Sequence, residues 1–217
     1  MKMKRSQLSQ DIIDTCLKMT KLGLNQGTAG NVSVRYCSGM LITPTGIPYE
    51  KLTESHIVYI DADGRHEENK LPSSEWRFHL AAYQTRPDAH AVIHNHAVHC
   101  TAVSILNRAI PAIHYMVAAA GGNSIPCAPY ATFGTHKLST HVMAALQERK
   151  ATLLQHHGLI VCESSLEKAL WLAHEIEILA QLYLETLAII DPVPTLDDAA
   201  IAIVLEKFKT YGLRIEE

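Results

Sequence analysis

Apolar residues recur at steps of three and four positions in several stretches of the chain, a spacing that predicts helices with one buried side. The longest stretch covers residues 165–189. A second covers residues 8–22, where Gly23 is the expected helix stop. Three further helices are predicted at residues 72–84, 135–148 and 195–212.

Short apolar runs bounded by turn residues predict strands between these helices. They lie at residues 33–35, 40–42, 56–60, 91–94 and 152–162, the last interrupted at Gly158. Helices and strands therefore alternate, and some of the strands form hairpin-like pairs. We predict an α/β fold with a central mixed, largely antiparallel sheet sandwiched between layers of helices. No repeat or long linker divides the chain, so we expect a single domain over residues 1–217.

Composition narrows the function classes. The formal net charge of −3 argues against a nucleic-acid partner, which would require a basic excess. No run of about 18 apolar residues and no apolar signal region occur, so we expect neither a membrane span nor export. The five cysteines are scattered without a C-x-x-C motif, which favours reduced thiols in the cytoplasm. Thirteen histidines against 19 lysines plus arginines hint at metal or proton chemistry.

The histidine motifs point to a metal site. In Ile93-His94-Asn95-His96, alternate side chains of a strand share a face, so His94 and His96 should point the same way. Either histidine of the pair His156-His157 could reach the same ion from a neighbouring strand. Glu75, in the first turn of a predicted helix, could supply a fourth ligand. Three imidazoles with one carboxylate or water suit zinc.

Each of these signals also has a purely structural interpretation. An isolated H-x-H motif often occurs without a metal. The pair His156-His157 also fits one buried and one exposed strand histidine, and Glu75 fits the preference of acidic residues for helix N-termini. Structural or surface roles are expected for His90, His99, His114, His141 and His174.

Three segments are suited to bind a phosphate without lysine or arginine. They are residues 27–31 and 43–46, which are rich in glycine and threonine, and Ser73-Ser74 at a predicted helix N-terminus. Taken singly, each is equally an ordinary turn or helix cap. Neither a P-loop nor a G-x-S-x-G motif is present. The pattern leaves a lysine Schiff-base enzyme open, although no lysine lies in a conspicuously apolar stretch.

Taken together, these segments resemble the class II aldolase/adducin family over essentially the whole chain. The resemblance rests on five motifs in order: residues 25–33 (NQGTAGNVS), 42–46 (ITPTG), 72–75 (PSSE), 94–96 (HNH) and 155–158 (QHHG). It implies a metal-dependent enzyme that reversibly cleaves a ketose 1-phosphate into dihydroxyacetone phosphate and an aldehyde.

The resemblance also implies residue roles and an assembly. One Zn²⁺ per subunit would be bound by Glu75, His94, His96 and His157, and Glu75 would leave the metal to act as the acid/base when substrate arrives. The aldehyde would be served by Tyr115 of a neighbouring subunit, with Phe133 and Tyr211. The enzyme would be a homotetramer with active sites at subunit interfaces. The phosphate would be bound by Thr28, Gly30, Asn31, Thr45, Gly46, Ser73 and Ser74.

Three alternatives remain at this point. A pentulose-phosphate 4-epimerase of the same family would share the zinc and phosphate sites but differ in the residues that serve the aldehyde. A non-catalytic adducin-like binding module has no need of an intact set of metal ligands. A metal-storage or sensor protein has no need of three phosphate-binding segments.

Overall fold

Within residues 4–210, which the computed structural model describes, seven strands form one sheet in the order β3-β2-β1-β4-β9-β8-β7. Neighbours are antiparallel except β7 and β8, which are parallel, so the predicted mixed, largely antiparallel sheet is confirmed. A second sheet pairs β5 (Ile110–Pro111) with β6 (Ser124–Ile125). The main-sheet strands are β1 (Asn31–Tyr36), β2 (Gly39–Ile42), β3 (Val58–Ile60), β4 (Ala91–Asn95), β7 (Cys127–Ala128), β8 (Ala151–Leu154) and β9 (Gly158–Glu163).

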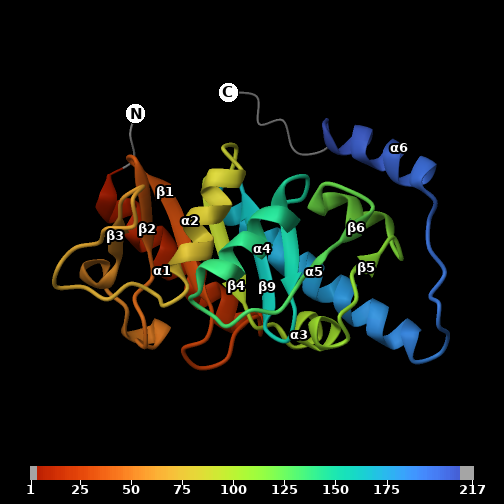
Figure 1. Cartoon of the computed structure of the whole chain (residues 1–217), viewed down its shortest axis with the longest axis horizontal. Coiled ribbons are helices and arrows are strands. Elements are labelled where there is room, and N and C mark those ends of the chain that lie inside the picture. The colour runs from red at the N-terminus through yellow and green to blue at the C-terminus, as the bar shows by residue number, and fades with distance from the viewer. Residues whose placement is uncertain (1–3, 211–217) are drawn as a thin grey trace.

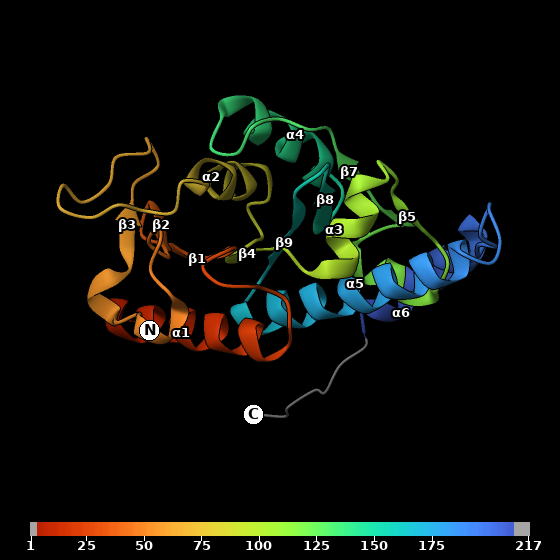
Figure 2. The same ribbon diagram turned by 90° about the horizontal axis from the view of Figure 1, so that it is seen from below.

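Helices cover both faces of this sheet, as the two views in Figures 1 and 2 show. Helices α2 and α4 lie on one face, whereas α1 and α5 lie on the other, with α3 packed beside α5. The predicted α/β sandwich is therefore confirmed. The α-helices are α1 (Arg5–Lys21), α2 (Trp76–Thr85), α3 (Val98–Ile105), α4 (His136–Leu146), α5 (Leu166–Leu187) and α6 (Asp198–Phe208), and the 3-10 helices are η1 (Tyr49–Lys51), η2 (Glu54–His56) and η3 (Tyr115–Ala120).

The alternation of side chains along each strand divides the core into two apolar clusters. Val32 of β1 and Ile93 of β4 belong to the cluster under α1 and α5. Val92 of β4 and Ile160 of β9 belong to the cluster under α2 and α4. Adjacent residues of one strand thus face opposite helical layers, as the two-residue period of a strand requires.

The prediction of one strand over residues 152–162 is wrong. The structure has a hairpin there, in which β8 and β9 pair antiparallel from Ala151 opposite Val161 to Leu154 opposite Gly158. The three residues between the strands reverse the chain, and His156 takes a left-handed backbone conformation with φ of 53°. Gly158, read as an interruption, is instead the first residue of the second strand.

The sequence pattern does not predict the elements between residues 98 and 128. Helix α3 spans eight residues and has no side-chain cap of its own. Its N-terminus is held by Glu177 of α5, whose carboxylate accepts hydrogen bonds from the backbone N–H groups of His99 and Cys100 at 2.9 Å each. A cap 77 residues away leaves no local signal.

The five predicted helices are all found in the described part of the chain, and their bounds shift by a few residues. The last one begins at Asp198 after the cap residue Asp197, which accepts a hydrogen bond from the backbone N–H of Ala200. It ends at Phe208, and the predicted end at residues 211–212 lies outside the described residues. Among the described helices, none is both long and apolar enough to cross a membrane.

Candidate metal centre and active site

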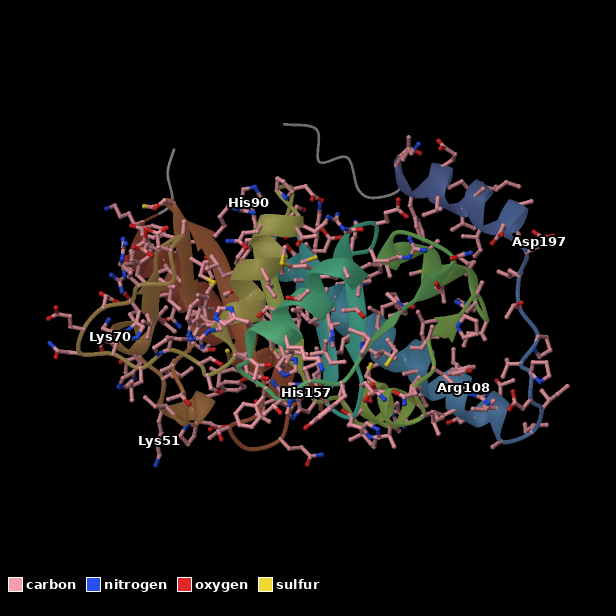
Figure 3. All side chains as sticks on the ribbon, viewed as in Figure 1. Lys51, Lys70, His90, Arg108, His157 and Asp197 are labelled. Atoms are coloured by element: carbon pink, nitrogen blue, oxygen red, sulfur yellow. The ribbon has the colours of Figure 1, made fainter. Side chains whose placement is uncertain are left out.

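The four predicted metal ligands come together at one end of the sheet. His94 lies near the end of β4 and His96 just beyond it, while His157 lies in the turn between β8 and β9 and Glu75 directly precedes α2. One nitrogen or oxygen atom from each of the four lies within 4.8 Å of all the others. In Figure 3, His157 marks this end of the sheet, and His90, just before β4, marks the opposite end.

Strand register explains why these residues meet. β4 ends at the edge where the antiparallel strands β1 and β9 begin, with Asn31 opposite His94 and Asn95 opposite Leu159. At this edge the chains approach so closely that a Cβ atom on Gly158 would lie 2.3 Å from the carbonyl oxygen of Asn95. Glycine is therefore required where the β8–β9 turn passes beside the histidines.

The same turn distinguishes the two adjacent histidines. His156 is exposed, whereas the side chain of His157 turns inward and places Nε2 at 3.1 Å from Glu75 Oε1. The residue pattern left either histidine of the pair open, and the family resemblance pointed to His157. The backbone of the turn directs the side chain of His157, and not that of His156, toward Glu75.

The donor set fits a metal ion. His94 Nδ1 donates a hydrogen bond to the carbonyl oxygen of Leu159 at 2.9 Å, so in the neutral ring Nε2 carries the free electron pair. That Nε2 faces His96 Nε2 at 3.0 Å and Glu75 Oε2 at 3.2 Å. Glu75 Oε1 is buried and, although His157 Nε2 lies 3.1 Å away, forms no hydrogen bond of good geometry among the described residues. Three imidazoles and a carboxylate with unpaired acceptor atoms form a cluster able to bind a divalent metal.

Electrostatics favour an ionised Glu75 and a neutral His96 ring. Burial raises the pKa of the Glu75 carboxyl, but His94 and His157 outweigh this effect and hold the pKa below its ordinary value. Burial, with contributions from His94 and His157, lowers the pKa of His96 to about 4. The carboxylate is thus ionised and the His96 ring neutral near pH 7.

Two of the predicted phosphate segments pack directly against each other. In the turn at residues 43–46, the backbone N–H of Thr45 donates to the carbonyl oxygen of Leu71 at 3.2 Å, and that of Ser73 donates to the carbonyl oxygen of Thr43 at 3.0 Å. Ser73 is buried and its hydroxyl accepts from the backbone N–H of Glu75 at 3.3 Å. Ser74 and Gly46 are exposed at the surface of this pair of segments.

The third segment reaches the site through Asn31 and Gly30. Asn31 Nδ2 donates to Glu75 Oε2 at 2.9 Å. Gly30 has φ of 77°, and a Cβ atom there would lie 2.3 Å from the side chain of Asn25, which in turn accepts a hydrogen bond from the backbone N–H of His96. Thr28 lies exposed in the turn of the same loop. Residues 27–31 and 73–74 therefore border the metal ligands, and residues 43–46 adjoin them through Ser73.

The three residues predicted to bind the aldehyde are not brought together with the metal ligands within the described residues. Tyr115 is 48% exposed at the start of η3, and within residues 4–210 its ring contacts His114 and none of the four ligands. Phe133 is 61% exposed and adjoins Gly134, where a Cβ atom would lie 2.9 Å from the carbonyl oxygen of Ser74. Tyr211 lies outside the described residues.

An open pocket of about 470 Å³ adjoins two of the metal ligands. It brings apolar side chains of α3 next to His96 and His157, so a ligand there would contact both the imidazoles and an apolar wall. The pocket is lined by Gln26, Ala29, His96, Val98, Thr101, Ala102, Ile105 and His157.

The sequence pattern does not single out His79, although it is fully buried and lies one helical turn after Glu75. Its ring nitrogens contact Asn31 and Ser33 of β1. A histidine four residues from a candidate ligand on a predicted helix is a signal that could have drawn attention to it.

Comparison with known proteins identifies the family. The family described as Class II Aldolase and Adducin N-terminal domain matches residues 10–184. The chain belongs to this family. The resemblance inferred from the five motifs is therefore confirmed.

Relatives within the family are similar over their full lengths. A protein of Escherichia coli strain K12, named L-fuculose phosphate aldolase, is 81% identical over 99% of this chain and 100% of its own. A protein of Escherichia coli O45:K1, named 5-methylthioribulose-1-phosphate/5-deoxyribulose-1-phosphate aldolase, is 54% identical over 98% of this chain and 100% of its own. A solved structure titled L-fuculose 1-phosphate aldolase superposes with a TM-score of 0.90 at 37% identity, covering 94% of this chain and 97% of its own. The chain is thus an enzyme of the class II aldolase type, and a sugar phosphate is consistent with its family.

Proposed function

We propose that this protein catalyses the reversible aldol cleavage of L-fuculose 1-phosphate to dihydroxyacetone phosphate and L-lactaldehyde, a step of fucose metabolism in the cytoplasm. The observation that carries the proposal is the position of Glu75. One of its oxygens lies against His157, the other accepts a hydrogen bond from Asn31, and Ser73 and Ser74 directly precede it. One carboxylate therefore borders both the metal ligands and the proposed phosphate site.

The ion in the proposal is Zn²⁺, one per subunit, held by Glu75, His94, His96 and His157. When bound, it supplies Lewis-acid stabilisation of the negative charge that develops on the substrate oxygens as the carbon–carbon bond forms or breaks. The nitrogen and oxygen donor set supports zinc in preference to magnesium or calcium, which favour all-oxygen sites.

Glu75 is the proposed acid/base. In the direction of bond formation its carboxylate takes a proton from the carbon beside the ketone of dihydroxyacetone phosphate, and in cleavage it returns that proton. Its depressed pKa keeps the carboxylate ionised, and the free electron pairs of Oε1 can accept the proton. In this proposal Glu75 is a metal ligand in the resting enzyme and leaves the metal when substrate arrives. Its position directly before α2 supports the role, because the helix fixes the backbone that carries the carboxylate.

The phosphate of the substrate would be bound by Thr28, Gly30, Asn31, Thr45, Gly46, Ser73 and Ser74. Backbone N–H groups and hydroxyls of these segments would bind it without a cationic side chain. Phosphate binding then orients the reacting carbon against Glu75, so that remote binding energy lowers the barrier to proton transfer.

The aldehyde part of the substrate would be bound by residues of two subunits. In the proposed homotetramer, Tyr115 of a neighbouring subunit gives its phenol proton to the aldehyde oxygen as the bond forms, and Phe133 and Tyr211 position the aldehyde. The exposure of Tyr115 on an isolated chain supports a role at a subunit contact.

A second candidate substrate has specific support. The 54% identical relative is named for cleavage of 5-methylthioribulose 1-phosphate and 5-deoxyribulose 1-phosphate. These ketose 1-phosphates differ from L-fuculose 1-phosphate in the aldehyde part, so the same metal and phosphate residues would serve both. The higher identity to proteins named for L-fuculose phosphate favours that substrate.

A substrate panel tests the proposal. The purified protein is assayed with L-fuculose 1-phosphate, 5-deoxyribulose 1-phosphate, 5-methylthioribulose 1-phosphate and a pentulose 5-phosphate, with coupled reduction of any dihydroxyacetone phosphate released. We expect the highest kcat/KM with L-fuculose 1-phosphate. Epimerisation of the pentulose phosphate without cleavage would support the epimerase alternative, and no turnover of any compound would support a non-catalytic module.

Removing the metal tests whether cleavage depends on a bound ion and whether that ion is Zn²⁺. Exhaustive chelation is expected to abolish cleavage and to lower the Tm, because an ion bound only by the folded state stabilises it. Zn²⁺ should restore both, whereas Mg²⁺ should not. Unchanged activity after chelation, with no metal found by elemental analysis, would refute a metal-dependent mechanism.

A further inference from the structure

Five buried polar side chains form a continuous hydrogen-bonded row between α2 and β1. Tyr83 Oη lies 2.9 Å from Ser33 Oγ, which lies 2.7 Å from His79 Nδ1. His79 Nε2 contacts Asn31 Oδ1, and Asn31 Nδ2 lies 2.9 Å from Glu75 Oε2. None of the five residues is more than 7% exposed. We call this row the Tyr83–Glu75 chain.

The ionised carboxylate at one end and a neutral His79 ring fix the direction of every hydrogen bond in the Tyr83–Glu75 chain. An ionised carboxylate only accepts, so the Asn31 atom that faces Glu75 is the amide nitrogen. The amide oxygen then faces His79, whose Nε2 must carry a proton. A neutral ring protonated at Nε2 accepts at Nδ1, so Ser33 donates to it and in turn accepts from Tyr83.

These hydrogen-bond directions require a neutral His79 ring, and its surroundings keep the ring neutral. Burial, together with the nearby His94, lowers the pKa of His79 to about 3, although Glu75 acts in the opposite sense. The ring is fully buried and stacks on Phe78 with centroids 5.1 Å apart, so it cannot turn to water. Both nitrogens are occupied within the Tyr83–Glu75 chain.

We propose that His79 is a positioning residue: by donating to the Asn31 oxygen, it holds the Asn31 amide with its nitrogen toward Glu75. Without that donor, rotation of the amide by half a turn would place its oxygen against the carboxylate. The two oxygens would then repel, and Glu75 would lose the hydrogen bond that fixes its orientation. The inference rests on the proposed function to the extent that Glu75 is the acid/base.

Two substitutions of His79 separate positioning from packing. His79→Leu keeps an apolar body in the core but removes the donor to Asn31. His79→Gln restores an N–H donor near the position of Nε2. We expect kcat per folded molecule to fall about 10- to 100-fold in His79→Leu, the usual effect of losing a buried hydrogen bond that supports a charge. His79→Gln should recover to within about fivefold of the unsubstituted protein.

Ser139→Ala serves as the matched control for the loss of a buried polar contact. Ser139 lies in α4, and its hydroxyl donates to the carbonyl oxygen of Thr135, the N-cap residue of that helix. Its kcat should equal that of the unsubstituted protein. The proposal is overturned if folded His79→Leu has unchanged kcat, or if His79→Gln is as slow as His79→Leu.

A spectroscopic measurement tests the proposal without activity. In the whole protein labelled with ¹⁵N-histidine, the ring signals of His79 are those lost in His79→Gln. Long-range ¹H–¹⁵N spectra should show a neutral ring protonated at Nε2, unchanged from pH 7 to pH 5. A ring protonated at Nδ1, or at both nitrogens, would overturn the proposal. Because this result does not depend on turnover, it remains decisive if the substrate panel finds no cleavage, and it applies if His79→Leu fails to fold.

Discussion

The two faces of the central sheet are built from alternate residues of the same strands, yet they differ sharply in chemistry. Toward α1 and α5, β1 and β4 present Val32, Val34 and Ile93 to an apolar cluster. Toward α2, the alternate positions of β1 and β4, at the end of the sheet that carries the candidate metal ligands, are Ser33 and His94, both fully buried. The first face supplies apolar burial alone, whereas the second combines an apolar cluster with directional contacts around Glu75.

This difference reflects two kinds of physical interaction. Apolar burial stabilises in proportion to the area removed from water and is indifferent to direction, so that face tolerates changes that conserve volume. A buried polar atom needs a particular partner, and its loss costs the desolvation of whatever remains. We therefore expect substitutions of apolar residues on the α1–α5 face to change stability, and substitutions of the buried polar residues on the α2 face to change turnover.

The sharpest way to test this division is Glu75→Gln. The amide keeps the shape of the carboxylate but cannot accept the substrate proton, so we expect kcat to fall about 1,000-fold, within the usual range for a general base. The Tm should fall by no more than chelation lowers that of the unsubstituted protein, because the variant loses one of the four proposed metal ligands but keeps the shape of the side chain. Steady-state kinetics and thermal unfolding measure the two effects, and full activity in this variant would remove Glu75 as the acid/base.

Ile93→Ala tests the opposite face at the residue next to His94. Ile93 is fully buried, and shortening it leaves a cavity, so the free energy of unfolding should fall by about 2–5 kcal/mol. The kcat per folded molecule should stay within about threefold, because its side chain points away from the ligands. Urea unfolding gives the first quantity, and Ile93→Val is the graded control, with an expected loss of about 0.5–1.5 kcal/mol. A large loss of kcat without a loss of stability would contradict the division between faces.

Glu67→Gln removes the charge of a surface ion pair outside both core clusters, so it shows how small the effect of a surface contact is beside the two core substitutions. The hydrogen bond from Arg5 is the largest cause that lowers the pKa of Glu67 to about 2. Both side chains are about one-third exposed, so we expect a loss below about 1 kcal/mol at pH 7.

The pH dependence of that small effect follows from its sign. The folded-state pKa lies below the unfolded value of about 4.3, so the stabilisation is fully present above pH about 4.3 and is lost as the pH falls toward 2. Urea unfolding of both proteins between pH 7 and pH 2 should show the difference disappearing over that interval. A difference that persists at pH 2 would show that the charge of Glu67 is not its cause.

The sequence by itself determined the elements with strong periodicity and the identity of the candidate ligands. The three- and four-residue spacing in α1 and α5 and the two-residue spacing of His94 and His96 are local properties, because each follows from the geometry of one element. Ordered motifs identified the family for the same reason, since they need no knowledge of which segments meet.

Tertiary structure decided everything that depends on distant segments. Helix α3 is capped by Glu177 from another helix, so its sequence carries no start signal. The left-handed turn at His156 turned a predicted single strand into a hairpin and selected His157 as the inward residue. His79 acquires its partners only because α2 packs on β1, where Asn31 and Ser33 lie 48 and 46 residues away. Periodicity fixes which side of an element is buried, but hydrogen bonds between elements depend on register and packing, which emerge only when the chain is folded.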